Sequence, residues 1–150
     1  MLLLGCIADD LTGATDLGIT LAREGLSVIQ VNGIPESDLA VPVADAVVVA
    51  LKSRTIAPAD AIAQALAALA WLRARGAERI YFKYCSTFDS TPRGNIGPVT
   101  EALREALGVA PDGLPTPATP AYPRNGRTVY RGHLFVGDVL LCDSGMRSHP

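Results

Sequence analysis

The sequence predicts an α/β fold, with an open and mostly parallel sheet that carries helices on its faces. Three observations support this class: short apolar runs alternate with longer helical patterns, most of the runs end in polar clusters, and 49% of the 150 residues are hydrophobic. Strands that alternate with helices of ten or more residues are typical of βαβ units, which build parallel sheets. The length suits one domain with a buried core.

The expected strands are continuous apolar runs, as found in strands that are buried on both faces of a sheet. They cover Leu2–Ala8, Ser27–Val31, Ala46–Leu51 and Arg79–Phe82. The expected helices place apolar residues at helical spacing and end at a glycine, which favours a helix C-terminus. They cover Thr12–Glu24, the segment from Pro58 to Gly76, and Pro98–Leu107. This order predicts a Rossmann-like arrangement in three layers.

The pattern weakens after Gly108. Residues 109–126 include five prolines, which cannot donate the hydrogen bonds of a central strand, so we expect an irregular surface segment there. Residues 128–141 again mix β-branched and aromatic side chains, and the sequence ends in polar residues. We therefore expect residues 1–150 to form one incomplete domain.

Composition and charge exclude several classes of function. The net charge is −2 and no basic block is present, so the sequence lacks the electrostatic footprint of a nucleic-acid-binding protein. The three cysteines are widely spaced and form no C-x-x-C pair, which predicts reduced thiols and no metal site. The apolar N-terminus soon reaches Asp9 and lacks a basic region, so it fits a buried strand better than a signal peptide or a membrane span. We expect a soluble cytoplasmic protein.

Polar clusters follow three of the predicted strands directly. They read "ADDLTGATD" from Ala8, "KSRT" over residues 52–55 and "KYCSTFDSTPRGN" over residues 83–95. In open α/β sheets, ligands bind at the carboxyl ends of the strands, beside the N-termini of the helices. Three polar clusters at one edge therefore predict a binding site for a polar ligand.

The first cluster contains two adjacent carboxylates. Asp10 or Thr12 could simply cap the helix that follows, but capping leaves Asp9 unexplained. Strand geometry predicts that Asp9 and Asp10 point to opposite faces, and their charges repel. We therefore expect one of them to meet a ligand hydroxyl or a cation. Gly13 would let a ligand approach the backbone closely.

The second and third clusters add cations and hydroxyl groups. Arg54 presents a planar fork that can hold a carboxylate through two parallel hydrogen bonds, although a solvated loop is the alternative. Lys83 precedes a run of hydroxyl and carboxyl side chains with more donors and acceptors than a turn requires. In that run Asp89 could instead organise an Asx-turn, and Asn95 could cap the next helix. The third cluster predicts half of a pocket for a sugar acid.

Other motifs are weak or absent. The sequence contains neither G-x-x-x-x-G-K-[ST] nor G-x-G-x-x-G, so it shows no recognised nucleotide-binding loop. Adjacent aspartates do not match the aspartyl-phosphatase pattern, in which one residue separates them. His133 and His149 are isolated, which favours a structural or surface position for each.

The segments "IADDLTGATD", "VVVALKSRT" and "YFKYCSTFDSTPRGNIGPV" together resemble the four-carbon acid sugar kinase family, and the third is most similar to the branch that acts on 3-oxo-tetronates. The resemblance covers residues 3–108 and resumes from "PAYPRNG" to the end. It implies an N-terminal sugar-acid-binding domain followed by a C-terminal nucleotide-binding domain. Members transfer the γ-phosphoryl group of ATP, with Mg²⁺, to a hydroxyl of a four-carbon acid such as 3-oxo-tetronate, erythronate or threonate.

The resemblance also implies residue roles. Substrate contacts would come from Asp9, Asp10, Ser53, Arg54, Lys83, Ser86, Asp89, Ser90 and Thr91. Asp10 or Asp89 would accept the hydroxyl proton, and Lys83 would neutralise charge on the transferred group.

This chain would then supply the sugar-acid-binding half of a kinase, C-terminally truncated and without an evident ATP site. The nucleotide-binding domain would lie elsewhere, in cis or in trans. The proline-rich residues 109–123 depart from the family pattern, which has a shorter apolar strand there. A non-catalytic sugar-acid-binding module and an inactive remnant are the alternatives. We expect the chain alone to bind the acid weakly and to transfer little phosphate.

Overall fold

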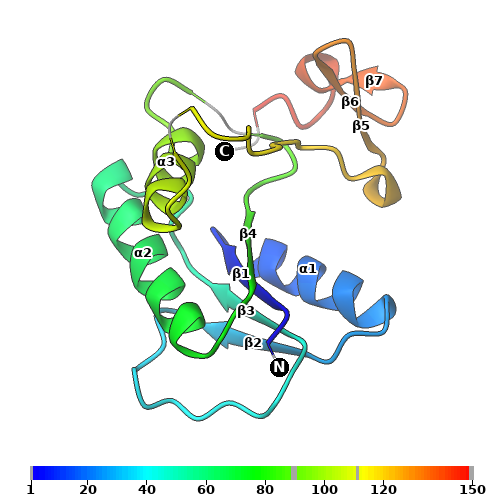
Figure 1. The fold of residues 1–150 in the computed structure, drawn as a ribbon. Helices are drawn as coiled ribbons and strands as arrows, with labels where there is room; N and C mark the ends of the chain where they lie inside the picture. The colour runs from blue at the N-terminus through cyan, green and yellow to red at the C-terminus, as the bar shows by residue number, and fades with distance from the viewer. Residues whose placement is uncertain (1, 89–90, 111, 149–150) are drawn as a thin grey trace.

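A computed structural model describes residues 2–88, 91–110 and 112–148 of the chain (Figure 1). Its main sheet has four parallel strands in the order β2-β3-β1-β4. These are β1 (Leu4–Ala8), β2 (Val28–Asn32), β3 (Ala46–Ala50) and β4 (Arg79–Lys83). The predicted open parallel sheet is confirmed, and each strand starts and ends within two residues of the expected bounds.

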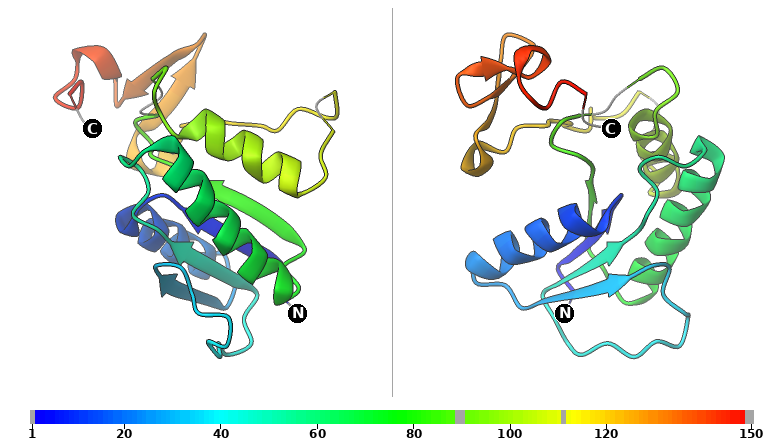
Figure 2. Two further views of the ribbon diagram at one scale, coloured as in Figure 1. Left: turned by 90° about the vertical axis from the view of Figure 1, so that its left-hand side faces the viewer. Right: turned by 180° about the vertical axis from the view of Figure 1, so that it is seen from behind.

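Helices cover both faces of this sheet, which gives the three predicted layers (Figures 1 and 2). One face packs against α1 (Leu11–Arg23), and the other against α2 (Pro58–Ala74) and α3 (Ile96–Ala106). Pro58 is the first residue of α2, where its missing N–H costs no hydrogen bond. No helix in the described part of the chain has the length and apolar character needed to cross a lipid bilayer.

Successive side chains along a strand point to opposite faces of the sheet, so they enter the two parts of the core in turn. On β3, Val47 and Val49 pack with the α2 side of the core, and Val48 packs with the α1 side. Every residue of β3 is buried, whereas β4 lies at the edge of the sheet and is partly exposed. The central position of β3 and β1 explains their continuous apolar sequences.

The connections after β1 and β3 leave the sheet in opposite directions. After β1 the chain enters α1 on one face, and after β3 it enters α2 on the other face. This reversal between two adjacent parallel strands opens a crevice at their carboxyl ends, where α/β proteins bind ligands. The two polar clusters after β1 and β3 therefore meet at the switch point of the sheet.

A second, smaller sheet follows the proline-rich segment. It is antiparallel and contains β5 (Arg127–Tyr130), β6 (His133–Val136) and β7 (Val139–Leu140), flanked by the short 3₁₀ helices η1 (Pro123–Asn125) and η2 (Leu141–Asp143). We call residues 119–148 the β5–β7 unit. Residues 112–121 form no strand or helix, as expected from their prolines.

The β5–β7 unit is attached to the rest of the molecule through side chains. The hydroxyl groups of Tyr122 and Thr20 lie 3.1 Å apart, and Arg124 forms a 2.7 Å ion pair with Glu24. Both partners in the main domain belong to α1 or the residue after it. The unit therefore lies on the α1 side of the parallel sheet (Figures 1 and 2).

The three cysteines differ in their exposure. All three are free thiols, with Cys6 and Cys85 buried and Cys142 exposed. Burial raises the pKa of Cys6 to about 12, so this side chain is a neutral part of the core at physiological pH.

Close packing of β1 against α2 gives a first prediction. A Cβ atom at Gly5 would lie 3.1 Å from side-chain atoms of Leu72, Ala77 and Ile80. Because interiors tolerate added volume poorly, Gly5→Ala should lower the free energy of unfolding by about 1–2 kcal/mol in urea titrations. Gly97→Ala on α3 is the control, since nothing lies within 4 Å of the added methyl group. It should leave stability unchanged or slightly raised, and equal losses at both sites would contradict this packing.

Candidate functional site

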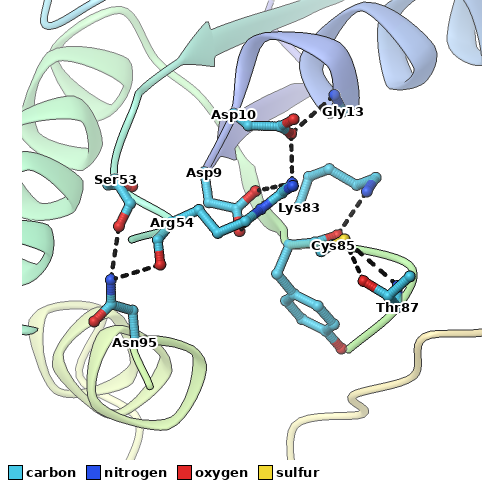
Figure 3. Close-up of polar contacts among 10 residues, drawn as sticks. Asp9, Asp10, Gly13, Ser53, Arg54, Lys83, Cys85, Thr87 and Asn95 are labelled. Atoms are coloured by element: carbon cyan, nitrogen blue, oxygen red, sulfur yellow. Dashed lines mark hydrogen bonds and ion pairs between the residues drawn. The ribbon is translucent and has the colours of Figure 1, made fainter. Parts of the chain in front are cut away.

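The centre of the site is Arg54, in the loop after β3, which contacts both carboxylates that follow β1 (Figure 3). Its Nε donates to Asp9 Oδ2 at 3.3 Å, and its Nη2 donates to Asp9 Oδ1 at 3.1 Å. The same Nη2 lies 2.8 Å from Asp10 Oδ1. One guanidinium therefore joins the carboxyl ends of two neighbouring strands.

The expectation that Asp9 and Asp10 point to opposite faces is wrong. Alternation along a strand ends at Ala8, the last residue of β1, and Asp10 is already the N-cap residue of α1. Both carboxylates turn toward the same cation. The cation that meets both carboxylates is a residue of the chain itself, and the fork of Arg54 already contacts Asp9.

Burial and charge act against each other in this cluster. Asp9 is only 6% exposed; burial raises the pKa of its carboxyl group, and the hydrogen bond and charge of Arg54 offset part of that rise. Burial alone would lower the pKa of Arg54, but the hydrogen bond and charge of Asp9 outweigh it, so the pKa is raised. Arg54 therefore remains a cation, and each partner compensates the buried charge of the other.

Asp10 rather than Thr12 caps helix α1. Its Oδ1 accepts a hydrogen bond from the N–H of Gly13 at 2.9 Å, while its backbone is extended. Gly13 has a structural reason to be glycine, because a Cβ atom there would lie 2.5 Å from Asp10 Oδ1. The Asp10 side chain keeps 25% of its surface exposed, so it can also face a ligand.

Asn95 positions the loop that carries Ser53 and Arg54. It stands at the N-cap position of α3 as expected, but its side chain makes no capping hydrogen bond. Instead its buried amide group donates to the backbone oxygens of Ser53 at 2.6 Å and Arg54 at 3.1 Å (Figure 3). It also donates to the backbone oxygen of Ile56 at 3.0 Å. Sequence reasoning missed this role, since these partners lie in a different segment of the chain.

The third cluster contributes Lys83, the last residue of β4. Its Nζ donates to the backbone oxygen of Tyr84 at 2.6 Å. Farther along, the Sγ of Cys85 lies 2.8 Å from the hydroxyl of Thr87. The exposed Thr91 accepts a hydrogen bond from the N–H of Arg93 at 3.2 Å, as in an ordinary turn. The predicted site residues Asp89 and Ser90 lie outside the described residues.

The polar clusters border an open cleft of about 320 Å³ at the carboxyl edge of the sheet. Four of the predicted site residues line it, namely Asp10, Arg54, Lys83 and Ser86. Further lining residues are Thr12, Gly13, Asp16, Cys85, Thr87, Arg127 and Met146. Asp9 and Ser53 stand behind this cleft and border a much smaller cavity beside Asn95.

Arg127 is a cleft residue that the sequence analysis did not identify. It belongs to β5 and reaches the cleft with Met146 from the β5–β7 unit. No motif around it suggests a ligand, and only the fold brings it near Lys83. The cleft thus holds three basic side chains and two acidic ones, Asp10 and Asp16.

The fold and cleft define this protein as an open parallel α/β domain that presents a charged cleft at its topological switch point. Comparison with known proteins makes the class specific. A family model described as a sugar-binding N-terminal domain matches residues 4–150, and the chain belongs to this family.

Curated relatives agree with this assignment. The chain is 62% identical to a 3-oxo-tetronate kinase of Burkholderia multivorans over 148 residues, which are 99% of this chain and 33% of that protein. It is 53% identical to the 3-oxo-tetronate kinase of Escherichia coli K12 over 150 residues, all of this chain and 37% of that protein. The resemblance to sugar-acid kinases is thus confirmed. The chain spans about a third of the length of these relatives.

Solved structures show the same fold. A crystal structure from Salmonella typhimurium LT2 superposes with a TM-score of 0.87 at 50% identity, over 100% of this chain and 35% of that one. A domain of unknown function from Bordetella bronchiseptica, crystallised with bound citrate as a domain-swapped dimer, has a TM-score of 0.71 at 33% identity. That match covers 94% of this chain and 34% of the other.

The compensation between Arg54 and Asp9 gives a second prediction. Arg54→Gln leaves a buried carboxylate without its cation, which should cost about 3–5 kcal/mol of unfolding free energy at neutral pH. Arg54 lowers the pKa of Asp9, so its removal raises that pKa further above the ordinary value of 3.8. A raised folded-state pKa favours folding at low pH and disfavours it as the pH rises. The deficit should therefore shrink as the pH falls from 7 toward 4.

Urea unfolding of the variant and the unchanged chain at several pH values measures this effect. Arg93→Gln removes an exposed guanidinium from the turn before α3 and serves as the control. A deficit for Arg54→Gln that stays constant from pH 7 to pH 4 would argue against a buried Asp9 charge.

The close approach of Gly13 to Asp10 gives a third prediction. Gly13→Ala must displace the Asp10 carboxylate, so helix α1 loses its cap at a cost of about 0.5–2 kcal/mol. Gly18→Ala is matched to it, because Gly18 is in the same helix and its added methyl would meet only Val28 at an ordinary 3.8 Å. That control should gain up to about 1 kcal/mol from helix propensity. Since both glycines lie in α1 and share the propensity gain, the lost cap is the difference between the two variants in thermal unfolding followed by circular dichroism, and equal changes at both positions would contradict the cap.

Proposed function

We propose that this chain supplies the substrate-binding half of an ATP-dependent kinase for four-carbon acid sugars. The first candidate substrate is 3-oxo-tetronate, the acid in the names of the curated relatives, and erythronate and threonate are the others. The observation that carries the proposal is the charged cleft of about 320 Å³ at the switch point of the sheet. Its size is near the lower end of the range for small-molecule sites, as a four-carbon ligand requires.

The chemistry of the cleft suits a hydroxylated anion. Lys83 supplies a positive charge, and the N-terminus of α1 favours negative groups. Among the described residues, both contacts of Asp10 involve Oδ1, which leaves Oδ2 to accept a hydrogen bond from a ligand hydroxyl. The Ser86 hydroxyl lines the same cleft. The Bordetella relative, which shares this fold over 34% of its chain, was crystallised with bound citrate, which is also a small carboxylic acid.

Asp9 and Ser53 enter the proposal as supports of the pocket. Asp9 holds Arg54 in place from behind the cleft, and the N–H of Ser53 donates to the backbone oxygen of Asp9 at 3.0 Å. Arg54 in turn orients Asp10 at the cleft wall. Direct substrate contacts by Asp89, Ser90 and Thr91 stay predictions from the resemblance.

Phosphoryl transfer depends mainly on positioning and electrostatic stabilisation. In the proposed reaction a substrate hydroxyl oxygen forms a bond to the γ-phosphorus of ATP, and the bond from that phosphorus to the ADP oxygen breaks. The hydroxyl proton passes to a carboxylate, either Asp10 or Asp89. Lys83 neutralises negative charge on the transferred group. Asp10 is well placed for this task because it lines the cleft and is held by Gly13 and Arg54.

ATP and Mg²⁺ are assigned to the part of the kinase outside these residues. The described residues hold no group of three or more His, Cys, Asp or Glu side chains that could bind a metal ion. Asp9 and Asp10 are already paired with Arg54, so they do not fit Mg²⁺. The proposal therefore requires a nucleotide-binding domain, in cis or in trans, and a cytoplasmic setting where ATP is present.

Ligand titrations test the proposed binding. The chain should bind at least one of 3-oxo-tetronate, erythronate and threonate, as followed by changes in its amide NMR spectrum. Lys83→Met should weaken that binding about tenfold or more, because a hydrogen bond to a charged group contributes roughly 1.5–3 kcal/mol. Lys52→Met, which removes an exposed lysine after β3, should bind as the unchanged chain does. If the unchanged chain and both variants bind with equal affinity, Lys83 does not contact the ligand.

A chimera tests the proposed reaction. Residues 1–150 would replace the matching third of the Burkholderia multivorans kinase, and ATP consumption with each acid would be measured. We expect phosphate transfer to one of the three acids by the chimera and negligible transfer by the 150-residue chain. A folded chimera that binds ATP and phosphorylates none of the acids would contradict the proposal.

A further inference from the structure

We propose that Arg127 on β5 binds the carboxylate of the acid ligand and sets the direction in which the ligand lies in the cleft. This inference rests on the proposed function, because it takes the ligand to be a small hydroxylated acid. It assigns to the β5–β7 unit a role that the sequence analysis gave to Arg54. The structure describes both arginines, and their side chains have different hydrogen-bond partners.

Two of the three guanidinium nitrogens of Arg54 already contact carboxylates of the chain. Its Nε and Nη2 serve Asp9 at 3.3 and 3.1 Å, and Nη2 also contacts Asp10 at 2.8 Å. A ligand carboxylate at Arg54 would compete with two carboxylates held there by the fold. Exchange of a buried ion pair for a ligand would leave Asp9 without a partner, which is costly. Arg54 is therefore a poor receptor for a third carboxylate.

The donors of Arg127 are poorly satisfied by comparison. Its Nη1 donates to the backbone oxygen of Asn125 at 2.8 Å, and its Nη2 lies 2.8 Å from the sulfur of Met146. A thioether is a weak hydrogen-bond acceptor. The buried Nε of Arg127 has no acceptor among the described residues. A buried donor without a partner is destabilising, and a ligand carboxylate that displaces the Met146 sulfur from Nη2 would also reach Nε and satisfy both donors better.

The backbone of Arg127 is connected to helix α1 through Tyr122. Its N–H donates to the backbone oxygen of Tyr122 at 3.1 Å, and its own oxygen accepts from the N–H of Tyr122 at 2.9 Å. Tyr122 is in turn hydrogen-bonded to Thr20 on α1. These contacts place the start of β5 beside the helix whose N-terminus lines the cleft.

The cleft is lined by residues from two parts of the chain. Arg127 and Met146 come from the β5–β7 unit, whereas Asp10, Lys83 and Ser86 come from the main domain. A ligand whose carboxylate contacts Arg127 directs its hydroxyls toward Asp10 and Ser86. This orientation presents a hydroxyl, and not the carboxylate, to the proposed proton acceptor. It also makes the cleft selective for acids over the corresponding polyols.

Binding of erythronate and of erythritol tests the inference, since the two share hydroxyl groups and only erythronate has a carboxylate. Both would be titrated into the unchanged chain and into Arg127→Met, Arg127→Lys and Arg131→Met. Arg131 lies exposed in the turn after β5 and is the matched control. Arg127→Met should weaken erythronate binding about tenfold to hundredfold and leave any erythritol binding unchanged. Arg127→Lys should fall between, because lysine keeps the charge without the planar fork.

A direct readout is the Nε–H resonance of Arg127 in the unchanged chain, assigned by its loss in Arg127→Lys. It should shift on addition of erythronate and stay in place with erythritol. If the chain binds erythronate while this resonance stays fixed and Arg127→Met binds as tightly, the inference is overturned and the proposed function stands. If the folded chain binds none of the three acids at millimolar concentration, the proposed function fails and the inference fails with it.

Discussion

The ion-paired group of Asp9, Asp10 and Arg54 is the interaction on which the site depends. It ties the carboxyl end of β1 to the loop after β3, at the place where the chain leaves the sheet toward opposite faces. Two adjacent carboxylates would repel each other without a cation between them. Because the Arg54 guanidinium attracts both carboxylates, it compensates this repulsion and connects two βα units.

Other parts of the site are arranged around this link. Asn95 brings α3 to the loop that carries Arg54, through three donated hydrogen bonds. Asp10 starts α1 and forms one wall of the cleft, and Gly13 leaves room for its carboxylate. The same residues thus stabilise helix termini and shape the cleft. This shared use explains why polar residues gather at the ends of these strands.

Much of the fold follows from the sequence because each element has a local signal. The apolar run "AVVVA" of β3 and the glycines after α1 and α2 place strands and helix ends within two residues. The order of the strands in the sheet has no such local signal, because it depends on which face of the sheet each connection crosses. The site likewise combines features that have a local sequence signal with features that have none. The clusters after β1, β3 and β4 were recognisable, whereas the partner of Arg54 and the cleft position of Arg127 depend on contacts between distant segments.

The side-chain attachment of the β5–β7 unit has a consequence for its dynamics. The Arg124–Glu24 pair is more than half exposed on both sides, and exposed pairs contribute about 0–1 kcal/mol. Local opening needs less free energy where few apolar contacts are buried, and all of β5 except its first residue is exposed. Amide protons of β5 and β6 will therefore exchange with solvent well before those of β1 and β3. A ligand that contacts both Arg127 and the main domain would slow that exchange, because it would hold the β5–β7 unit against the main domain.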